Sequence, residues 1–331
     1  MNQKDKIKIF ATRKLPDALC KELQNCNSGL ELICTETDTP LGKDELLKRV
    51  EDEEPYGIVI TLAEKCKSDV VSRLPESVKA ISTIAVGTDN IDSKACKERG
   101  IGVYNTPDLL TEATADLTWA LILSASRRVI EGHKMCVNNQ FAGWSPTLLM
   151  GKELNGATLG IVGLGRIGKA VARRASGFGM KVIYNNRKPM EISEEAYFTD
   201  LNLNPPEYVT VDDLCRISDV ISLHCPLNKE SLRLFDEARL LSCKKDAVLV
   251  NMARGTVIDE GALVKTLKNG HFMGVGLDVY ENEPAIHKGL MEIDRAVLLP
   301  HIGSATTATR WKMMTAAVNA IVKHFRDMDR S

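Results

Sequence analysis

Three segments in the second half of the chain each place one reactive side chain directly after an apolar run. VNMARG carries Arg254, ENEP carries Glu283 and LLPHIGSAT carries His301. If the apolar runs are parallel strands, their carboxyl ends meet at one edge, where open α/β sheets bind their ligands. A cation, a carboxylate and an imidazole gathered there could bind an anion and transfer a proton. Each residue alone also has an ordinary explanation, as a surface arginine, a loop glutamate or a histidine that caps a helix.

A glycine-rich segment near the middle of the chain has the spacing of a dinucleotide-binding turn. GLGRIG, which begins at Gly163, follows the apolar run TLGIVG and opens an amphipathic stretch, as the G-x-G-x-x-G motif requires. Gly163 permits the tight turn, Gly165 lets a pyrophosphate approach the backbone, and Gly168 lets helix and strand pack closely. The N–H groups of Arg166 and Ile167 would face the phosphates at the positive end of the helix dipole. The alternative is a glycine-rich turn without a ligand.

The residues that follow the next apolar run indicate which dinucleotide would bind. About 20 residues after the turn, a carboxylate is expected to accept a hydrogen bond from the ribose 2'-hydroxyl. Here Tyr184 is followed by Asn185, Asn186, Arg187 and Lys188. A carboxylate would repel a 2'-phosphate, whereas arginine offers a planar, charged fork to phosphate oxygens. The missing acid and the added bases both favour NADP over NAD; the alternative is that these are solvated loop charges.

The composition limits the remaining possibilities. The chain has 331 residues, of which 44% are hydrophobic and 26% charged, as expected for a globular protein of two domains. Its formal net charge of -1 provides no overall field for nucleic acid or an acidic membrane, so we expect neither as a partner. No run approaches the roughly 18 apolar residues of a membrane span.

The cysteines and the N-terminus indicate a reducing compartment. Nine cysteines without a C-x-x-C pair favour free thiols and argue against a metal site. The N-terminal segment MNQKDKIKIF passes directly into a strand-like run and contains no apolar signal segment. We therefore expect a cytoplasmic protein without a bound metal.

Two series of apolar runs, alternating with helix-period segments, must position the reactive side chains. The first series predicts five buried strands: KIKIFAT, LELICTE, YGIVITL, KAISTIAVG and IGVYNTP. The second series predicts six: TLGIVG, KVIYN, DVISLHC, AVLVNMA, GVGLDV and AVLLPH. A long helix, roughly 111–133, and an irregular arm, 138–152, separate the two series, and a last helix covers about 306–325. This alternation predicts an α/β protein with parallel sheets in two domains, the second a full dinucleotide-binding sheet.

In combination, these motifs resemble the D-isomer-specific 2-hydroxyacid dehydrogenases, and most closely their glyoxylate/hydroxypyruvate reductase branch. The resemblance spans almost the whole chain and is carried by AVGTDNID, TPDLLTEATADL, GLGRIG, NMARG, GLDVYENEP and LPHIGSAT. It implies a Rossmann dinucleotide-binding domain over residues 106–299, with a dimerisation helix and arm at 108–152. It also implies a flavodoxin-like substrate domain over residues 1–105 plus 300–331, completed by the C-terminal helix.

The resemblance implies a role for each catalytic residue. His301 would protonate the carbonyl oxygen during reduction and act as the base in reverse, while Glu283 would orient its ring and favour the imidazolium. Arg254 would bind the substrate carboxylate and polarise the ketone. The backbone N–H groups of Val86 and Gly87 would hold the same carboxylate from the other domain. The substrate would then be trapped in an interdomain cleft whose closure excludes water.

The resemblance also implies further contacts with NADPH, the expected cofactor. Asp278 would meet its nicotinamide end. The other predicted lining residues are Pro226, Met252, Gly303, Ser304 and Thr114.

Three side chains have two interpretations each. Trp144, in the arm, would reach into the site of the neighbouring subunit in a homodimer, or would be an interface or core tryptophan. Leu62, between the small residues Thr61 and Ala63, would limit the size of the substrate, or would be a core leucine. His224, in SLHCPL, is expected to pack near the cofactor rather than to react.

The leading hypothesis is an NADPH-dependent reductase that converts glyoxylate to glycolate and hydroxypyruvate to D-glycerate. The second is an NAD-dependent D-2-hydroxyacid dehydrogenase for another substrate, such as lactate or 3-phosphoglycerate. The third, from a different class, is a cofactor-sensing binding protein similar to the corepressors of this superfamily. Formate dehydrogenases share the architecture but lack the catalytic glutamate, so Glu283 argues against them.

Overall fold

The structure, a computed structural model, describes residues 6–328 and divides the chain into two compact units. Unit 1 comprises the chain up to Leu110 together with the segment from Thr306 onward, and unit 2 comprises Thr111–Ala305. The sequence-based boundaries, after residues 105 and 299, therefore lie five and six residues too early. The second boundary moves because main-chain N–H groups at 302 and 303 are bound by a side chain of unit 2.

Unit 1 contains a five-stranded parallel sheet in the order β2-β1-β3-β4-β5, which is the flavodoxin-like order. All five strands predicted from the first series are present. Their bounds are Ile7–Ala11 (β1), Leu30–Cys34 (β2), Gly57–Ile60 (β3), Ala80–Thr83 (β4) and Gly102–Tyr104 (β5).

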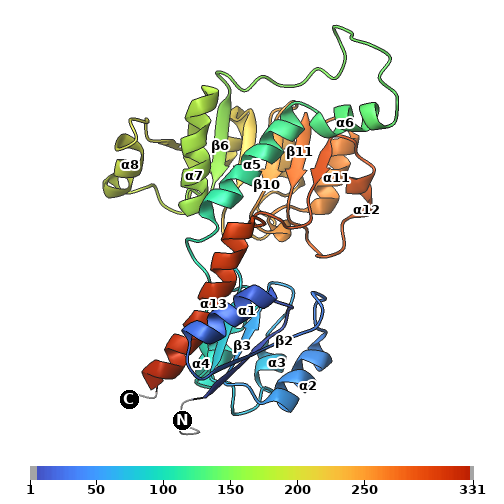
Figure 1. Ribbon diagram of the computed structural model, residues 1–331. Helices are drawn as coiled ribbons and strands as arrows, with labels where there is room; N and C mark the ends of the chain where they lie inside the picture. The colour runs from blue at the N-terminus through green and yellow to red at the C-terminus, as the bar shows by residue number, and fades with distance from the viewer. Residues whose placement is uncertain (1–5, 329–331) are drawn as a thin grey trace. The chain divides into compact units, whose positions relative to one another are not determined.

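Helices cover both faces of this sheet, because successive side chains of a strand point to opposite faces. Phe10 and Ile58 pack in one apolar cluster with α2, α3 and α4, whereas Ile9 and Val59 pack in another with α1 and α13 (Figure 1). The last helix extends to Met328, three residues beyond the predicted end. The helices of unit 1 are Asp17–Cys26 (α1), Lys43–Glu53 (α2), Ser68–Val71 (α3), Ser93–Glu98 (α4) and Thr307–Met328 (α13).

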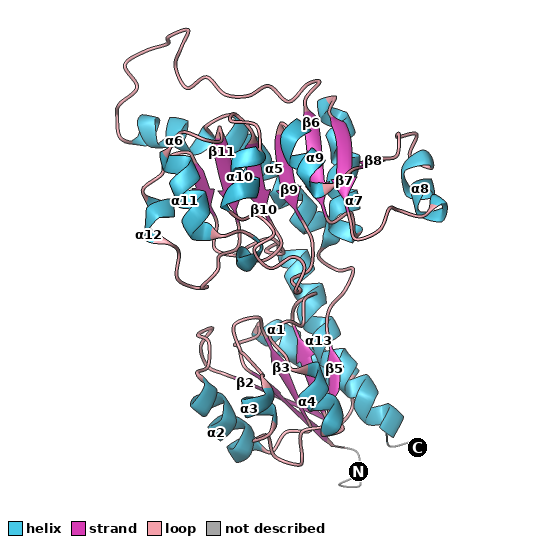
Figure 2. Cartoon of the chain, turned by 180° about the vertical axis from the view of Figure 1, so that it is seen from behind, coloured by secondary structure: helices cyan, strands magenta, loops and turns pink. Residues whose placement is uncertain are grey.

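Unit 2 contains a seven-stranded parallel sheet in the order β12-β11-β10-β9-β6-β7-β8 (Figure 2). Numbered within the unit and read from the β8 edge, this order is 3-2-1-4-5-6 with a seventh strand added, the Rossmann topology. The strands are Thr158–Val162 (β6), Lys181–Asn185 (β7), Glu207–Tyr208 (β8), Val220–Leu223 (β9), Val248–Asn251 (β10), Gly274–Leu277 (β11) and Ala296–Leu298 (β12). The prediction of six strands missed β8, which is two residues long and exposed, and so has no apolar pattern.

Two helical layers enclose the second sheet. Helices α5 and α7 lie on one face, where Trp119 and Val171 join the apolar cluster, and α9 to α12 supply residues such as Leu214 and Leu263 to the cluster on the other. The helices are Thr111–Ser126 (α5), Val129–Val137 (α6), Arg166–Ala175 (α7), Ile192–Thr199 (α8), Val211–Ile217 (α9), Glu237–Ser242 (α10), Glu260–Lys268 (α11) and Lys288–Met291 (α12).

The long helix predicted over 111–133 is in fact two helices, α5 and α6. The break occurs because the carbonyl of Ser126 accepts a hydrogen bond of 2.8 Å from the N–H of Lys152, where the chain returns from the arm. Gly151 permits this approach, since a Cβ there would lie 2.3 Å from the same carbonyl oxygen. Arg128 then adopts a left-handed conformation with φ 53°, and α6 begins at the next residue. The arm itself is irregular, as predicted, and forms the long loop after α6 in Figure 1.

Candidate active site

The sheet order of unit 2 brings the three predicted reactive residues to one edge. Strands β10, β11 and β12 are neighbours, and all three are parallel. Arg254 follows β10, Glu283 follows β11 and His301 follows β12. The three segments that the sequence analysis singled out therefore lie at the carboxyl ends of adjacent strands.

His301 and Glu283 are hydrogen-bonded, with 2.8 Å between Nδ1 and Oε2. An ionised carboxylate can only accept, so Nδ1 carries the proton and Nε2 is left for a ligand. The side chains are 30% and 35% exposed, so both remain accessible. Burial alone would raise the pKa of Glu283, but the bond and charge of His301, the N–H of Tyr280 and the charge of Arg254 outweigh it and lower that pKa.

The loop that carries Glu283 is fixed by its neighbours. Oε1 of Glu283 accepts from the N–H of Tyr280 at 3.0 Å, and the Tyr280 hydroxyl donates to the carbonyl of Leu299 at 2.9 Å. The second of these bonds ties the loop after β11 to the end of β12. Glu260, which is 4% exposed and whose pKa is raised by burial, accepts from the N–H of Glu281 at 2.7 Å. Neither Tyr280 nor Glu260 was predicted as a site residue, although Tyr280 lies within the GLDVYENEP motif.

Asp278 holds the segment that follows His301. Its two carboxylate oxygens accept from the N–H groups of Ile302 at 2.7 Å and Gly303 at 2.8 Å. Burial raises the pKa of this carboxyl, which is 1% exposed, while the two N–H groups and the charge of His301 act in the opposite direction. His301 has a left-handed backbone with φ 53°, a conformation that a non-glycine residue keeps only where neighbouring contacts hold it. Asp278 therefore positions the histidine, a role that the prediction of a nicotinamide contact did not include.

Arg254 is held by a side chain that the sequence analysis also missed. Asn251, the last residue of β10, accepts from the N–H of Ala253 at 3.0 Å and donates to the carbonyl of Arg254 at 3.0 Å. Asn251 is 1% exposed. The next residue, Gly255, lies against the loop after β11, because a Cβ there would be 1.8 Å from the carbonyl carbon of Tyr280. The arginine loop and the glutamate loop are thus in direct main-chain contact.

Several predicted cofactor-lining residues converge on one point in unit 2. A Cβ at Gly303 would lie 3.2 Å from Oδ2 of Asp278, 3.2 Å from Cε of Met252 and 3.5 Å from Cγ2 of Thr114. Ser304 is the next residue and is half-buried. These residues come from α5, from the ends of β10 and β11, and from the segment after β12, so only the tertiary structure assembles them.

The glycine-rich turn has the shape that a dinucleotide requires. Gly163 has φ 96°, and a Cβ there would lie 2.5 Å from the main-chain nitrogen of Cys225. A Cβ at Gly168 would lie 2.3 Å from the carbonyl oxygen of Gly163, whereas one at Gly165 would meet nothing within 4 Å. Gly165 is the N-cap of α7 and opens to space on the side from which a pyrophosphate would approach. The first residues of α7 are Arg166 and Ile167, the two predicted phosphate donors.

The loop after β9 completes this side of the turn. Nε2 of His224 lies 2.8 Å from Oγ of Ser222, and burial lowers the pKa of His224 to about 3. The histidine is therefore neutral, and its main chain abuts Gly163, in agreement with a packing role near the turn. Pro226 is exposed in the same loop, and its carbonyl accepts from Oγ of Ser231 at 2.7 Å.

The segment that follows β7 is held by three side chains. Oδ1 of Asn186 accepts from the N–H of Leu164, in the glycine-rich turn, at 2.8 Å. Nδ2 of Asn185 donates at 2.9 Å to the carbonyl of the residue after β8, and the Tyr184 hydroxyl accepts from the N–H of Met190 at 2.6 Å. These bonds give the basic segment a defined path beside the turn.

Arg187 and Lys188 lie at the centre of this anchored segment and are exposed. Within residues 6–328, neither side chain forms an ion pair. Two cations on a fixed segment beside a dinucleotide-binding turn are suited to bind an anionic group.

The residues predicted to bind the substrate from unit 1 follow its strands. Val86 and Gly87 lie in the loop after β4, and their N–H groups have no hydrogen-bond partner within the described part of the chain.

Leu62 follows β3, is half-buried and belongs to none of the four apolar clusters, so its interpretation as a core leucine is wrong. Trp144 is 83% exposed in the arm of unit 2, which excludes a core position within this chain.

The structure also describes the state of the cysteines, possible metal ligands and possible membrane-spanning helices. All nine cysteines are free thiols, as predicted. Within residues 6–328, no three His, Cys, Asp or Glu side chains are grouped so that they could hold a metal ion. No helix in the same range is long and apolar enough to cross a membrane.

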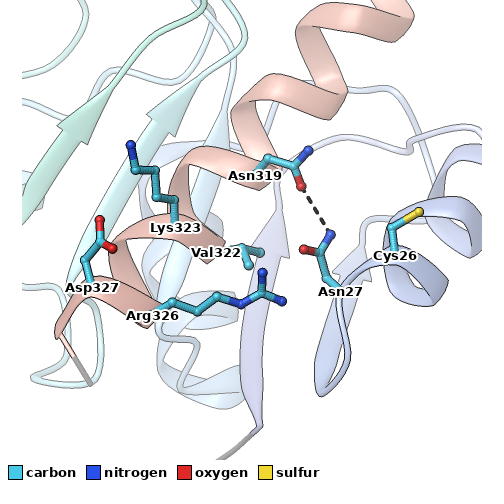
Figure 3. A pocket seen from close by; sticks show the side chains of 7 residues that line it. All are labelled: Cys26, Asn27, Asn319, Val322, Lys323, Arg326 and Asp327. Atoms are coloured by element: carbon cyan, nitrogen blue, oxygen red, sulfur yellow. Dashed lines mark hydrogen bonds between the residues drawn. The ribbon is translucent and has the colours of Figure 1, made fainter. Parts of the chain in front are cut away.

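A pocket of about 400 Å³ lies in unit 1 between α1 and α13, where Asn27 donates to Asn319 at 3.2 Å (Figure 3). None of the predicted site residues lines this pocket.

The chain is similar to known proteins over most of its length. Residues 119–303 match the family model of the NAD-binding domain of D-isomer specific 2-hydroxyacid dehydrogenases. The chain is 40% identical over 311 residues to a glyoxylate reductase of Thermococcus onnurineus, covering 92% of this chain and 89% of that protein.

Two solved structures extend the comparison to liganded proteins. An NADPH-dependent glyoxylate/hydroxypyruvate reductase from Sinorhizobium meliloti, in complex with NADP and malonate, has a TM-score of 0.78 and 28% identity, over 97% of this chain and 93% of that one. A D-lactate dehydrogenase from Aquifex aeolicus, complexed with NAD and lactic acid, has a TM-score of 0.79 and 30% identity, over 97% of this chain and 96% of that one.

Proposed function

Because the chain belongs to the D-isomer specific 2-hydroxyacid dehydrogenases, we propose that it reduces small 2-oxoacids with NADPH. Glyoxylate would be converted to glycolate, and hydroxypyruvate to D-glycerate. The observation that carries the proposal is the hydrogen-bonded pair of His301 and Glu283 on strands adjacent to the one that carries Arg254. This arrangement supplies a proton donor, a carboxylate that stabilises its charged form, and a cation for a bound anion.

The reduction follows from what each residue can donate. When bound, the reduced nicotinamide supplies a hydride to the carbonyl carbon. His301 donates the proton on Nε2 to the carbonyl oxygen, and Glu283 stabilises the imidazolium before transfer. Arg254 stabilises the negative charge that develops on the oxygen, and the N–H groups of Val86 and Gly87 bind the substrate carboxylate. Asp278 keeps His301 in place by holding the two residues that follow it.

The choice of NADP rests on the segment after β7. Arg187 and Lys188 are the groups that would bind the 2'-phosphate, and Asn186 provides an amide where a carboxylate would repel it. The similar reductase from Sinorhizobium meliloti is a complex with NADP, which supports this choice. The similar D-lactate dehydrogenase is a complex with NAD, so an NAD-dependent enzyme for lactate is the second candidate.

A substrate panel separates these candidates. Oxidation of NADPH and NADH is measured with glyoxylate, hydroxypyruvate, pyruvate and phosphohydroxypyruvate, with His301→Asn as the inactive control. We expect the highest kcat/KM with NADPH and either glyoxylate or hydroxypyruvate. A higher kcat/KM with NADH and pyruvate would overturn the proposal in favour of the second candidate. A protein that binds NAD(H) and a partner peptide without turnover would indicate a cofactor-sensing protein instead.

We further propose that the protein is a homodimer formed through its arm. Between α6 and β6, the arm exposes four large apolar side chains on a segment without helix or strand: Phe141, Trp144, Leu148 and Met150. Surface area of this kind is typical of an interface with another chain. Light scattering after size exclusion should give a dimer mass for the wild type and a monomer mass for Trp144→Asp. A monomeric wild type would contradict this proposal.

A further inference from the structure

The two N–H groups proposed to bind the substrate carboxylate belong to peptide units whose carbonyls are already bound. The N–H of Val86 shares a peptide unit with the carbonyl of Ala85, and the N–H of Gly87 shares one with the carbonyl of Val86. A trans peptide is planar, and its C=O and N–H point in opposite directions. Whatever fixes these two carbonyls therefore also fixes the directions of the two donors.

Asn105 fixes the peptide unit that joins Val86 and Gly87. Its Nδ2 donates to the carbonyl of Val86 at 2.7 Å, from the residue that directly follows β5. This bond aims the N–H of Gly87 away from Asn105. The Asn105 residue is half-buried.

Thr106 fixes the peptide unit that joins Ala85 and Val86. Its N–H donates to the carbonyl of Ala85 at 2.8 Å, and its hydroxyl donates to the same oxygen at 3.1 Å. Thr106 is 1% exposed. The N–H of Val86 is thereby directed away from Thr106.

The far end of the loop is anchored separately. Nδ2 of Asn90, which is 6% exposed, donates to the carbonyls of Thr61 and Glu64, both at 2.9 Å. Glu64, 2% exposed, in turn forms an ion pair with Arg13. The loop after β4 is therefore bound at both ends, while the N–H groups of Val86 and Gly87 have no partner within residues 6–328.

We propose that Asn105 is a positioning residue that presets the N–H of Gly87 for the substrate carboxylate. The inference rests on the proposed function, because it presumes that these N–H groups bind a 2-oxoacid. Preset donors bind an anion more tightly than mobile ones, since no reorganisation opposes binding. Asn105 would thus govern the affinity for the oxoacid but not that for the dinucleotide, whose predicted contacts lie in unit 2.

The test compares Asn105→Ala with Asn25→Ala, an exposed asparagine on α1 of the same unit. We expect Asn105→Ala to raise KM for glyoxylate about tenfold, the loss of one good hydrogen bond, while KM for NADPH changes less than about twofold. The inhibition constant of malonate should rise in parallel. Asn25→Ala should leave all three constants unchanged.

A second variant separates positioning from simple stabilisation of the loop. Asn105→Asp keeps the shape of the side chain, but its carboxylate cannot donate to the Val86 carbonyl and repels a bound carboxylate. It should raise KM for glyoxylate at least as much as Asn105→Ala.

If both variants melt at lower temperature but keep the wild-type KM for glyoxylate, Asn105 is only structural and the inference is wrong. A parallel rise in both KM values would also overturn it. A wild type that reduces no 2-oxoacid would overturn the proposed function, and this inference with it. Turnover by the wild type with an unaltered KM in the variants would overturn the inference alone.

Discussion

Under the proposed use of NADPH, replacing Arg187 by alanine should leave an enzyme that distinguishes poorly between the two coenzymes. Arg187 is exposed, forms no ion pair within residues 6–328, and lies on a segment fixed by Asn185 and Asn186. The variant removes a charge without removing a described contact of the fold. The variant should therefore weaken the binding of the 2'-phosphate and leave the stability of the fold unchanged.

The exposure of Arg187 determines the size of the effect. Two unit charges about 4 Å apart interact by roughly 1 kcal/mol in water and by roughly 4 kcal/mol at the effective dielectric of a protein surface. Solvent screening keeps exposed pairs at the lower end of that range. We therefore expect about 1.4 kcal/mol, which corresponds to an about tenfold rise in KM for NADPH. KM for NADH should stay within about twofold, because NADH has no 2'-phosphate.

Lys181 offers a matched control at the other end of the same strand. It is the exposed first residue of β7, whereas Arg187 lies just beyond the last, so Lys181→Ala makes the same change in net charge far from the phosphate site. Initial rates with saturating glyoxylate give both KM values for wild type and variants. Raising the salt concentration to about 0.5 M should reduce the NADPH preference of the wild type, because salt screens exposed charges.

Two results would refute this reasoning. Equal losses with NADPH and NADH in Arg187→Ala would show that the residue does not contact the 2'-phosphate. An equal effect in Lys181→Ala would show that the net charge of the unit, rather than a local contact, determines the preference.

Three further predictions concern the catalytic loops. Glu283→Gln should lower kcat by about 10- to 100-fold, since a charge-assisted hydrogen bond to His301 is lost, with KM for NADPH unchanged. Because the folded pKa of Glu283 is lowered from an ordinary value of 4.5, its ionised form stabilises the fold above that pH and ceases to do so as the pH falls through the lowered pKa. The difference in Tm between wild type and Glu283→Gln should therefore be present at pH 7, shrink as the pH falls below 4.5 and vanish once the pH is below the lowered pKa; a difference that stays constant over this fall would contradict the assignment. Asp278→Asn leaves one acceptor for two N–H groups, so kcat should fall at least about tenfold and Tm by a few degrees; an unaltered kcat would argue against its hold on His301. Gly255→Ala forces a Cβ to 1.8 Å from a main-chain carbon and should destabilise unit 2 by more than about 3 kcal/mol in denaturant unfolding, whereas Gly42→Ala, with nothing within 4 Å, should not.

The features that could be predicted from the sequence are those with a local signal. All the strands of both units except β8 were predicted, because their apolar runs are bounded by helix-period segments. The glycine-rich turn was predicted because its spacing and its place between strand and helix are both visible in the chain. Arg254, Glu283 and His301 were predicted because each follows such a run directly.

The features that were missed have no local signal. Strand β8 is short and polar, so only its pairing with β7 identifies it. The break between α5 and α6 depends on Gly151 and Lys152, which lie about 25 residues after Ser126 and occupy its carbonyl. No periodicity of the helix itself marks that position.

The sequence by itself determined the family of this protein, its two parallel-sheet units and the chemical groups at the strand ends, because motif spacing and hydrophobic period are properties of neighbouring residues. Only the tertiary structure decided how those groups are held. Asp278 reaches residues 302 and 303, Asn251 fixes Arg254, and Asn105 holds the carbonyl of Val86. Asp278 and Asn105 each join a side chain on one strand end to the main chain at another, and Asn251 fixes the start of the loop that leaves β10. The partner of such a bond depends on sheet order and register, which no segment of the chain encodes alone.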